Sequence, residues 1–401
     1  MSHLSYLEKL LDGVEVEWTT LGNEHAVEIA NSGRKPVKAS LRVAGETPYY
    51  GANNIQDYVD GYTHDGEFVL IAEDGSASLE KYSIQYATGR FWANNHVHVV
   101  RGKEGLNTRY LYHYLCIVNF VPFLSGGGRA KLTKGKLVDI PLPIPCPNNR
   151  EKSLAIQAEI VRILDAFTAM TAELTAELNM RKKQYNYYRD QLLSFEEGDV
   201  EWKTLGWIGD VRMCKRIMKN ETSDIGDIPF FKIGTFGKEP NAFISRDVFE
   251  EYKSKYNYPR VGEILISASG TIGRAVIFNG EDAYFQDSNI VWLENDESKV
   301  LNKYLFYFYQ IANWNVSDGG VIKRLYNDNI KKTLIPVPYP DDPERSLAEQ
   351  SRVVAILDKF DILTTSLQEG LPREIELRQK QYEYYRDLLL SFPQSHSDEA
   401  A

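Results

Sequence analysis

Two kinds of hydrophobic pattern alternate along the chain. From 153 to 195, apolar and aromatic residues recur at steps of four and three, a heptad pattern that predicts one long helix packed against a long partner. One extra step of four falls within two consecutive TAEL tetrapeptides, 171–174 and 175–178. Such a helix would be about 65 Å long, and each tetrapeptide adds about 6 Å. The pattern consists of Ile156, Ile160, Ile163, Phe167, Met170, Leu174, Leu178, Tyr185, Tyr188, Leu192 and Phe195.

A second region, from 346 to 392, repeats this pattern. It contains Gly370-Leu371-Pro372, which predicts a break or kink, because glycine commonly ends a helix and proline commonly begins one. Two long helices from repeated segments predict an antiparallel coiled coil. The alternative is that each helix packs on its own globular domain.

The regions 13–150 and 198–343 contain short apolar runs between Gly, Asn and Asp residues, which predicts strands. One helix is predicted late in each region, at Thr108–Phe120 and at Leu301–Ile311. Both regions are therefore predicted to be mixed α/β domains. The predicted strands are Glu67–Ala72, His96–Val100, Glu263–Ser267, Ala275–Phe278 and Asn289–Leu293.

The chain is an internal repeat of nearly 190 residues. Residues 181–195 (RKKQYNYYRDQLLSF) and 378–392 (RQKQYEYYRDLLLSF) are identical at 12 of 15 positions. Upstream of each lie a similar segment (153–167 and 346–360) and a proline-rich run (140–147 and 334–340), and VEW…TLG begins each α/β region. A unit of this length is too long for a solenoid repeat and indicates a duplicated domain-plus-helix module.

These patterns predict an α+β protein with a pseudo-two-fold internal repeat, in which two mixed α/β domains are separated and joined by two long helices. Residues 1–12 resemble the end of the first long helix, so we expect them to pack near the C-terminal helix. The predicted boundaries are an N-terminal segment at 1–12, a first domain at 13–150, a central helix at 151–197, a second domain at 198–343, a C-terminal helix at 344–395 and a tail at 396–401.

Composition narrows the function. The 401 residues carry a net charge of −10, which excludes a uniformly basic nucleic-acid binder but not a local basic surface. No apolar run reaches the ~18 residues of a membrane span and no signal peptide begins the chain, so we expect a cytoplasmic protein with no membrane partner. Three separated cysteines argue against a disulfide scaffold and a structural zinc site.

Catalytic motifs are absent from the sequence. The glycine-rich run at 126–136 lacks P-loop spacing, and the segment 266–270 lacks the first glycine of a nucleophile elbow. There is no Asn-Pro-Pro-aromatic segment of the kind that adenine methyltransferases use. His96 and His98 alternate along a predicted strand, and a partly exposed strand face explains them better than a metal site. We therefore predict no catalytic residues, no metal and no cofactor on this chain.

Nearly the whole chain resembles the specificity subunit of type I restriction–modification systems, and most closely the type IC branch. The resemblance is carried by the proline-rich runs, SLAIQAEIVRILDAF, TAELTAEL, the RKKQYNYYRD repeat, GLPREIELRQKQYEYYRD and the VEW…TLG segments. It implies two target-recognition domains that each read one half of a split asymmetric target on double-stranded DNA. It also implies helices that set the spacer, with two TAEL copies here.

The resemblance further implies a non-catalytic subunit of an adenine-specific DNA methyltransferase and restriction endonuclease complex. Two methyltransferase (M) subunits would dock on the pseudo-symmetric helices, and two restriction (R) subunits would be added outside. S-adenosylmethionine, ATP and Mg would be bound by those partners.

DNA contacts are predicted where basic or amide residues lie beside glycine-rich turns, because such turns allow phosphates and base edges to approach. The alternative is that each charge run is simply a solvated surface. The candidates are Arg129, Lys131, Lys134, Lys136, Asn53 and Asn54 in the first domain, and Ser269, Thr271, Arg274, Lys323, Arg324 and Lys331 in the second.

Partner contacts are predicted on the long helices, where aromatic residues and arginines are combined as they are in protein interfaces. Equally, the tyrosines could fill the space between the helices. The candidates are Tyr185, Tyr188, Arg189, Tyr382, Tyr385 and Arg386.

Two other classes of function are compatible with the sequence. One is a pseudo-symmetric adaptor whose two domains bind proteins and not DNA. The other is a DNA-modifying enzyme with an unrecognised site. Salt-dependent DNA binding would separate the first from a specificity subunit, and methyl transfer by the purified chain would identify the second.

Overall fold

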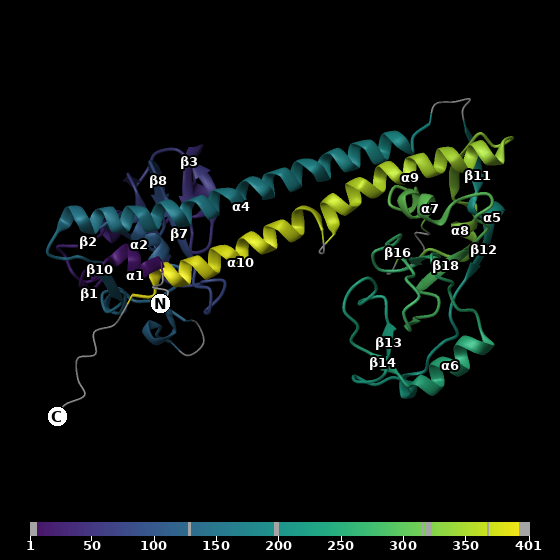
Figure 1. Ribbon diagram of the computed structural model, residues 1–401, viewed down its shortest axis with the longest axis horizontal. Helices are drawn as coiled ribbons and strands as arrows, with labels where there is room; N and C mark the ends of the chain where they lie inside the picture. The colour runs from purple at the N-terminus through teal and green to yellow at the C-terminus, as the bar shows by residue number, and fades with distance from the viewer. Residues whose placement is uncertain are drawn as a thin grey trace. The chain divides into compact units, whose positions relative to one another are not determined.

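A computed structural model describes residues 6–126, 130–195, 200–314, 316, 323–366 and 369–392, with the side chains of 6–8 excepted, and divides into two compact units. The first unit contains residues 1–175 and 374–401, and the second contains residues 176–373. Each unit combines one α/β domain with segments of the long helices (Figure 1). The tail at 396–401 lies outside the described residues.

The first unit contains ten strands and the helices that cover them within its described residues. Its elements are α1 (Tyr6–Leu11), β1 (Val16–Thr20), β2 (Val27–Ile29), β3 (Ala44–Tyr50), β4 (Ile55–Val59), β5 (His64–Asp65), β6 (Phe68–Ala72), β7 (Ile84–Ala87), β8 (Arg90–Ala93), β9 (Val97–Gly102), α2 (Thr108–Leu115), α3 (Lys134–Leu137), β10 (Pro141–Pro145), the start of α4 (Arg150–Leu192) and most of α10 (Gly370–Leu390).

The second unit repeats much of this order. Its elements are the end of α4, β11 (Val200–Thr204), α5 (Leu205–Ile208), β12 (Gly209–Arg212), β13 (Ile228–Phe231), β14 (Phe243–Ile244), α6 (Arg246–Lys255), β15 (Ile264–Ser267), β16 (Ala275–Ile277), β17 (Tyr284–Phe285), β18 (Ile290–Asn295), α7 (Asn302–Tyr309), α8 (Asn327–Lys332), β19 (Leu334–Pro338) and α9 (Pro343–Thr365).

The central sheets of the two units have the same topology. Their strand orders are β2-β9-β6-β7 and β12-β18-β15-β16, and neighbouring strands are antiparallel in both. A second sheet in each unit, with four strands in the first and three in the second, includes one parallel pair, β3 with β8 and β13 with β17. The prediction of two mixed α/β domains with long helices is therefore confirmed.

The proline-rich runs are strands that pair with the VEW segments. β10 pairs antiparallel with β1, and β19 pairs in the same way with β11. In the first pair, Leu21 N donates to Ile140 O and Cys146 N donates to Glu15 O. Because hydrogen-bonded and non-hydrogen-bonded pairs alternate, the prolines at 141, 143 and 145 occupy positions where no N–H is needed.

The predicted helix at 153–195 is α4, and the predicted break in the second copy separates α9 from α10. Gly370 has a φ of +79°, and a Cβ there would lie 2.5 Å from the carbonyl oxygen of Ile362. The predicted helix Thr108–Phe120 was too long, because α2 ends at Leu115. A separate 3-10 turn, Val121–Phe123, contains Pro122.

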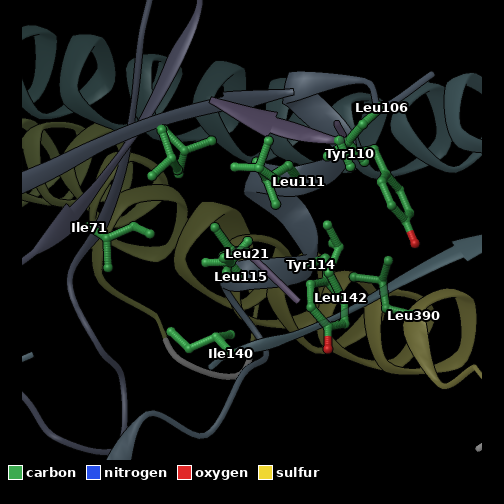
Figure 2. Packing of buried hydrophobic residues seen from close by; sticks show 14 of the residues in the cluster. Leu21, Ile71, Leu106, Tyr110, Leu111, Tyr114, Leu115, Ile140, Leu142 and Leu390 are labelled. Carbon is green, nitrogen blue, oxygen red and sulfur yellow. The ribbon is translucent and has the colours of Figure 1, made fainter. Parts of the chain in front are cut away.

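The long helices use two faces. One packs on the α/β domain: Ile160 and Leu164 of α4 are fully buried in the first unit's core, and Leu164 was missing from the predicted heptad pattern. The same core includes Leu11 of α1 and Leu390 of α10, and Figure 2 shows Leu390 among the domain's buried side chains. Both readings of the sequence, a helix pair and packing on a domain, therefore describe part of the structure.

The other face brings the helices together within each unit. Phe167 of α4 stacks on Tyr385 of α10 with ring centroids 5.2 Å apart, and the two helices run antiparallel there (Figure 1). In the second unit, Tyr188 of α4 stacks on Phe360 of α9 at 5.5 Å. The sequence repeat aligns Phe167 with Phe360 and Tyr188 with Tyr385, so these are two copies of one contact.

A buried glutamine joins helix and domain in both units. Gln157 accepts a hydrogen bond from Asn107 N at 2.8 Å and donates to Gly105 O at 3.0 Å. Its repeat counterpart, Gln350, accepts from Leu301 N at 2.9 Å and donates to Lys299 O at 3.1 Å. Equivalent bonds on unlike loops show that the duplicated frame is retained while the domains differ.

A carboxylate on the helix also anchors each domain, with different partners. Asp165 accepts from Arg109 at 2.9 Å and lies 2.8 Å from His113, whereas its counterpart Asp358 lies 2.6 Å from Lys303 and accepts from Tyr307. Burial would raise the pKa of Asp165, but the hydrogen bonds from Arg109 and His113 lower it overall. Burial lowers the pKa of His113, so this ring is neutral and donates from Nε2.

We expect mild acid to destabilise the first unit selectively. Burial lowers the pKa values of both His98 and His113 below the ~6.5 of an unfolded chain. The unfolded chain therefore binds more protons below pH 6.5, and stability is lost as the pH falls through this window. The second unit has no histidine, and its counterparts are Val291 and Tyr307. Pulse proteolysis at pH 7.5 and 5.5, with peptides assigned to each unit, measures the difference.

The matched variants are His98→Val and His113→Tyr, which install the second unit's residues. Together they should remove the difference between pH 7.5 and 5.5, whereas His25→Asn, at an exposed position, should leave it unchanged. Equal acid sensitivity of both units in the original chain would contradict the assignment to these two histidines.

Candidate nucleic-acid interface

The strongest candidate site is one backbone arrangement that occurs in both units with different side chains. In the first unit, Glu73 N donates to His96 O and Leu132 N donates to Glu73 O, at 2.8 and 2.7 Å. In the second unit, Ala268 N donates to Asn289 O and Leu325 N donates to Ala268 O, both at 2.8 Å. Bridges join Asp74 to Lys131 and Ser269 to Arg324. We call Glu73, Asp74, His96 and Lys131 the first quartet, and Ala268, Ser269, Asn289 and Arg324 the second quartet.

Both quartets lie at the ends of buried central strands. Glu73 and Asp74 directly follow β6, and His96 directly precedes β9, while the second quartet has the same relation to β15 and β18. Lys131 and Arg324 come from the loops before α3 and α8. A rigid buried sheet therefore positions polar side chains that need not pack, which is how recognition residues are commonly presented.

The first quartet is a charged network. Glu73 accepts from Arg34 at 2.6 Å and pairs with Lys131 at 3.0 Å, and His96 Nδ1 lies 2.6 Å from Asp74 Oδ1. Burial would raise the pKa of Glu73, but its bonds with Arg34 and Lys131 lower it overall, so the carboxylate stays ionised. The side chains of His96 and Lys131 remain 43% and 47% exposed, so they can reach a ligand.

The second quartet is a neutral amide and hydroxyl set beside one cation. Ser269 Oγ donates to Asn289 Oδ1 at 2.7 Å, and Arg324 Nη2 donates to the same oxygen at 3.0 Å. The turn that follows depends on glycine: Gly270 has a φ of +64°, and a Cβ on Gly273 would lie 2.3 Å from the Trp314 ring nitrogen. Amides, hydroxyls and arginine are the groups that read base edges.

Three of the DNA-contact residues predicted from sequence, Lys131, Ser269 and Arg324, fall in the quartets. Lys134 and Lys136 are exposed on α3, and Lys136 lies 3.7 Å from Asp139. Arg129 lies outside the described residues. Lys323 is exposed, and Lys331 pairs with Asp210 at 2.5 Å.

The remaining predicted DNA-contact residues have mixed surroundings. Asn53 uses its side-chain amide to hold a neighbouring loop, donating to Gly75 O and accepting from Ala77 N, both at 2.8 Å. Arg274 donates to Phe236 O at 2.8 Å and so turns back onto its own domain. Asn54 and Thr271 are exposed.

The predicted partner residues divide into packed and exposed ones. Tyr185 is buried in the second unit's core and donates to Gln310 at 2.8 Å, and Tyr382 packs on the first unit's core. Tyr188 and Tyr385 form the helix–helix stacks described above, yet remain 44% and 38% exposed.

The arginines of the two RD dipeptides occupy equivalent places. Arg189 and Arg386 each pair with the following aspartate, at 2.9 and 2.7 Å. Arg386 also lines a cleft of about 1050 Å³ between α10 and the first domain.

Sequence reasoning missed Glu73, Asp74, His96 and Asn289 as a group, and it missed two exposed tyrosines. Tyr187 and Tyr384, one position before the predicted tyrosines, are 61% and 65% exposed and are the more accessible aromatic residues. A usable signal was present in the polar residues that directly follow or precede buried strands. The tyrosines could have been found from the third residue of each YxYY segment, which lies off the heptad pattern.

Within the described part of the chain, no group of three or more potential ligand residues could hold a metal ion. Each helix described here is too short or too polar to span a membrane. The two α/β domains therefore share one topology and carry unlike polar quartets at equivalent places.

Comparison with known proteins defines the family. The model of the type I restriction modification DNA specificity domain matches residues 15–181 and 197–377. A putative type I restriction enzyme specificity subunit of Haemophilus influenzae is 62% identical over 396 residues, covering 97% of this chain and 98% of that protein. The EcoR124I/EcoR124II specificity subunit of Escherichia coli is 38% identical and covers 98% of both chains.

A solved type I restriction–modification S subunit from M. genitalium has the same fold, with a TM-score of 0.57 at 14% identity over 96% of this chain and 97% of that one. The chain therefore belongs to the type I restriction–modification DNA specificity family. It is a specificity subunit with two target-recognition domains, the non-catalytic component of a multi-subunit complex that acts on DNA.

Proposed function

We propose that each unit reads one half of a split, asymmetric target on double-stranded DNA and that the quartets take part in this reading. The observation that carries the proposal is the pairing of an equivalent backbone with unlike side chains, because two copies of one reader would otherwise recognise identical halves. Arg, Asn, Ser and Lys side chains supply donors and acceptors for base edges, and exposed lysines contact phosphates.

The long helices set the gap between the halves in this proposal. Half-sites one helical turn apart are about 34 Å apart, and a helix pair can span tens of ångströms. The tandem TAEL segments of α4 would tune that length. The presence of these segments also supports the assignment to the type IC branch.

Two methyltransferase subunits would dock on the helices, and two restriction subunits would join outside them. The exposed tyrosines at 187, 188, 384 and 385, with Arg189 and Arg386, support a docking surface that repeats in both copies. The partners would modify adenine and would hold S-adenosylmethionine, ATP and Mg, with no cofactor on this chain. We place the complex in the cytoplasm.

The test is to co-express this chain with its methyltransferase subunit in a host without DNA methylation and to map methyl-adenine across the genome. We expect one motif with two short, unlike halves around a fixed gap, and no methylation when either protein is expressed alone. A stable co-purified complex that leaves the genome unmethylated would contradict DNA reading and favour an adaptor. Methyl transfer by the purified chain alone would contradict its non-catalytic role.

A further inference from the structure

A positively charged cleft adjoins the second quartet. Its volume is about 360 Å³, and it lies entirely within the second unit. Four cationic residues line it, against one carboxylate: Arg216, Lys219, Lys232 and Arg324 against Asp287.

The carboxylate that lines the cleft is engaged by a lining arginine. Asp287 pairs with Arg216 at 2.9 Å, and its side chain is 18% exposed. Lys219 and Lys232 are exposed, and within the part of the chain that the structure describes no ion pair joins either of them to a carboxylate. The cleft therefore carries excess positive charge at neutral pH.

At the equivalent place in the first unit, a carboxylate of the domain itself neutralises the cations. Arg34 and Arg216 follow β2 and β12, the equivalent strands of the two central sheets, and the bonds donated by Leu132 N and Leu325 N align Lys131 with Arg324. In the first unit Glu73 bonds to both Arg34 and Lys131, at 2.6 and 3.0 Å. In the second unit the residue at that position is Ala268, so no such carboxylate is present there.

We propose that the cleft of the second unit binds a phosphate of the DNA backbone and that the first unit has no equivalent phosphate site. Lysine ammonium groups are suited to this role, because they act as mobile point charges on phosphate oxygens. The amides of Gln286 and Asn289 line the same cleft, so the bound phosphate would place an adjacent base beside the second quartet. The inference rests on the proposed function.

The two units should therefore contribute unequally to the salt dependence of DNA binding. Each phosphate contact steepens the fall of log affinity with log salt concentration by about 0.9. The half-site read by the second unit should therefore contribute more of the salt dependence than the half-site read by the first.

The experiment uses the complete complex of this chain with its methyltransferase and a duplex that carries the motif found by methylation mapping. The affinity of Lys219→Ala/Lys232→Ala is measured from 0.05 to 0.3 M salt, added as KCl. We expect the affinity at about 0.1 M salt to fall about tenfold. The slope of log affinity against log salt concentration should become shallower by about 1. Lys253→Ala/Lys255→Ala removes two charges from α6 of the same unit that do not line the cleft, and should change neither quantity.

Two exchanges test the role of the internal carboxylate. Ala268→Glu should weaken DNA binding and make its salt dependence shallower, as Lys219→Ala/Lys232→Ala does. Glu73→Ala should make the salt dependence steeper. If Ala268→Glu fails to fold, the lysine variant and Glu73→Ala still decide. An unchanged slope in the lysine variant, with the motif still bound and methylated, would overturn this inference and leave the proposed function intact. Failure of the complex with the unaltered chain to bind and methylate the motif would instead overturn the proposed function.

Inorganic phosphate distinguishes a backbone phosphate from a free one. We expect no thermal stabilisation of the original chain by 10 mM phosphate beyond that seen with the lysine variant. Stabilisation of the original chain alone, with an unchanged DNA slope in the variant, would identify a small-anion site and overturn the proposal.

Discussion

Deletion of residues 175–178 is expected to shorten the gap between the two halves of the methylated motif and to leave both halves unchanged. Four residues correspond to about 6 Å of helix, or about one or two base pairs of DNA. The deletion removes the extra step of four from the heptad pattern, so the apolar seam stays continuous and the helix should still pack. Thr175 is exposed, and its side chain bonds only within α4, to Thr171 O. Methylation mapping of the co-expressed variant measures the gap.

A matched control replaces residues 175–178 by four alanines, which keeps the helix length and should keep the gap. Because the original motif carries the longer gap, it should lose its methylation almost completely in the deletion variant. An unchanged gap, or an altered half-site sequence, would show that α4 does not set the spacing.

The helices were the part of the fold that the sequence predicted best. Their repeated segments retain strong identity, and residues such as Phe167, Tyr188, Phe360 and Tyr385 make one duplicated contact. Heptad spacing predicts a helix with one apolar face, and Gly370-Leu371-Pro372 predicts the break, so α4 and the start of α10 could be placed within a few residues. Leu164 was missed because α4 packs on two faces, and a single heptad pattern describes only one of them.

The candidate site was harder to predict because its members are far apart in sequence. Asp74, His96 and Lys131 meet only when three separate segments end beside one sheet, and no local pattern relates them. The glycine-rich turn at 269–274 was identified from its composition, but the amide Asn289 that completes the second quartet lies fifteen residues beyond it. Among the predicted partner residues, Tyr185 is buried and its hydroxyl bonds to Gln310, which the heptad pattern alone does not reveal.

Exchange of quartet residues is the second prediction with a large effect. Asp74→Ser/His96→Asn gives the first unit the side chains found at the equivalent positions of the second unit. The pair Asp74–His96 presents a carboxylate and a ring nitrogen, whereas Ser269–Asn289 presents a hydroxyl and an amide. A base-edge contact contributes about 1–3 kcal/mol of discrimination, so preference at the contacted base should fall about 10- to 100-fold or change identity.

The change should be confined to one half of the motif, because each quartet is held by its own sheet and no quartet residue is shared between the units. The reciprocal variant, Ser269→Asp/Asn289→His, is the matched control and should alter only the other half. Both variants keep the backbone bonds of the quartets, which involve main-chain atoms. Methylation mapping reads both halves at once. Equal loss at both halves would indicate a folding or assembly defect, whereas an unchanged motif would mean that bases are read elsewhere in the domains.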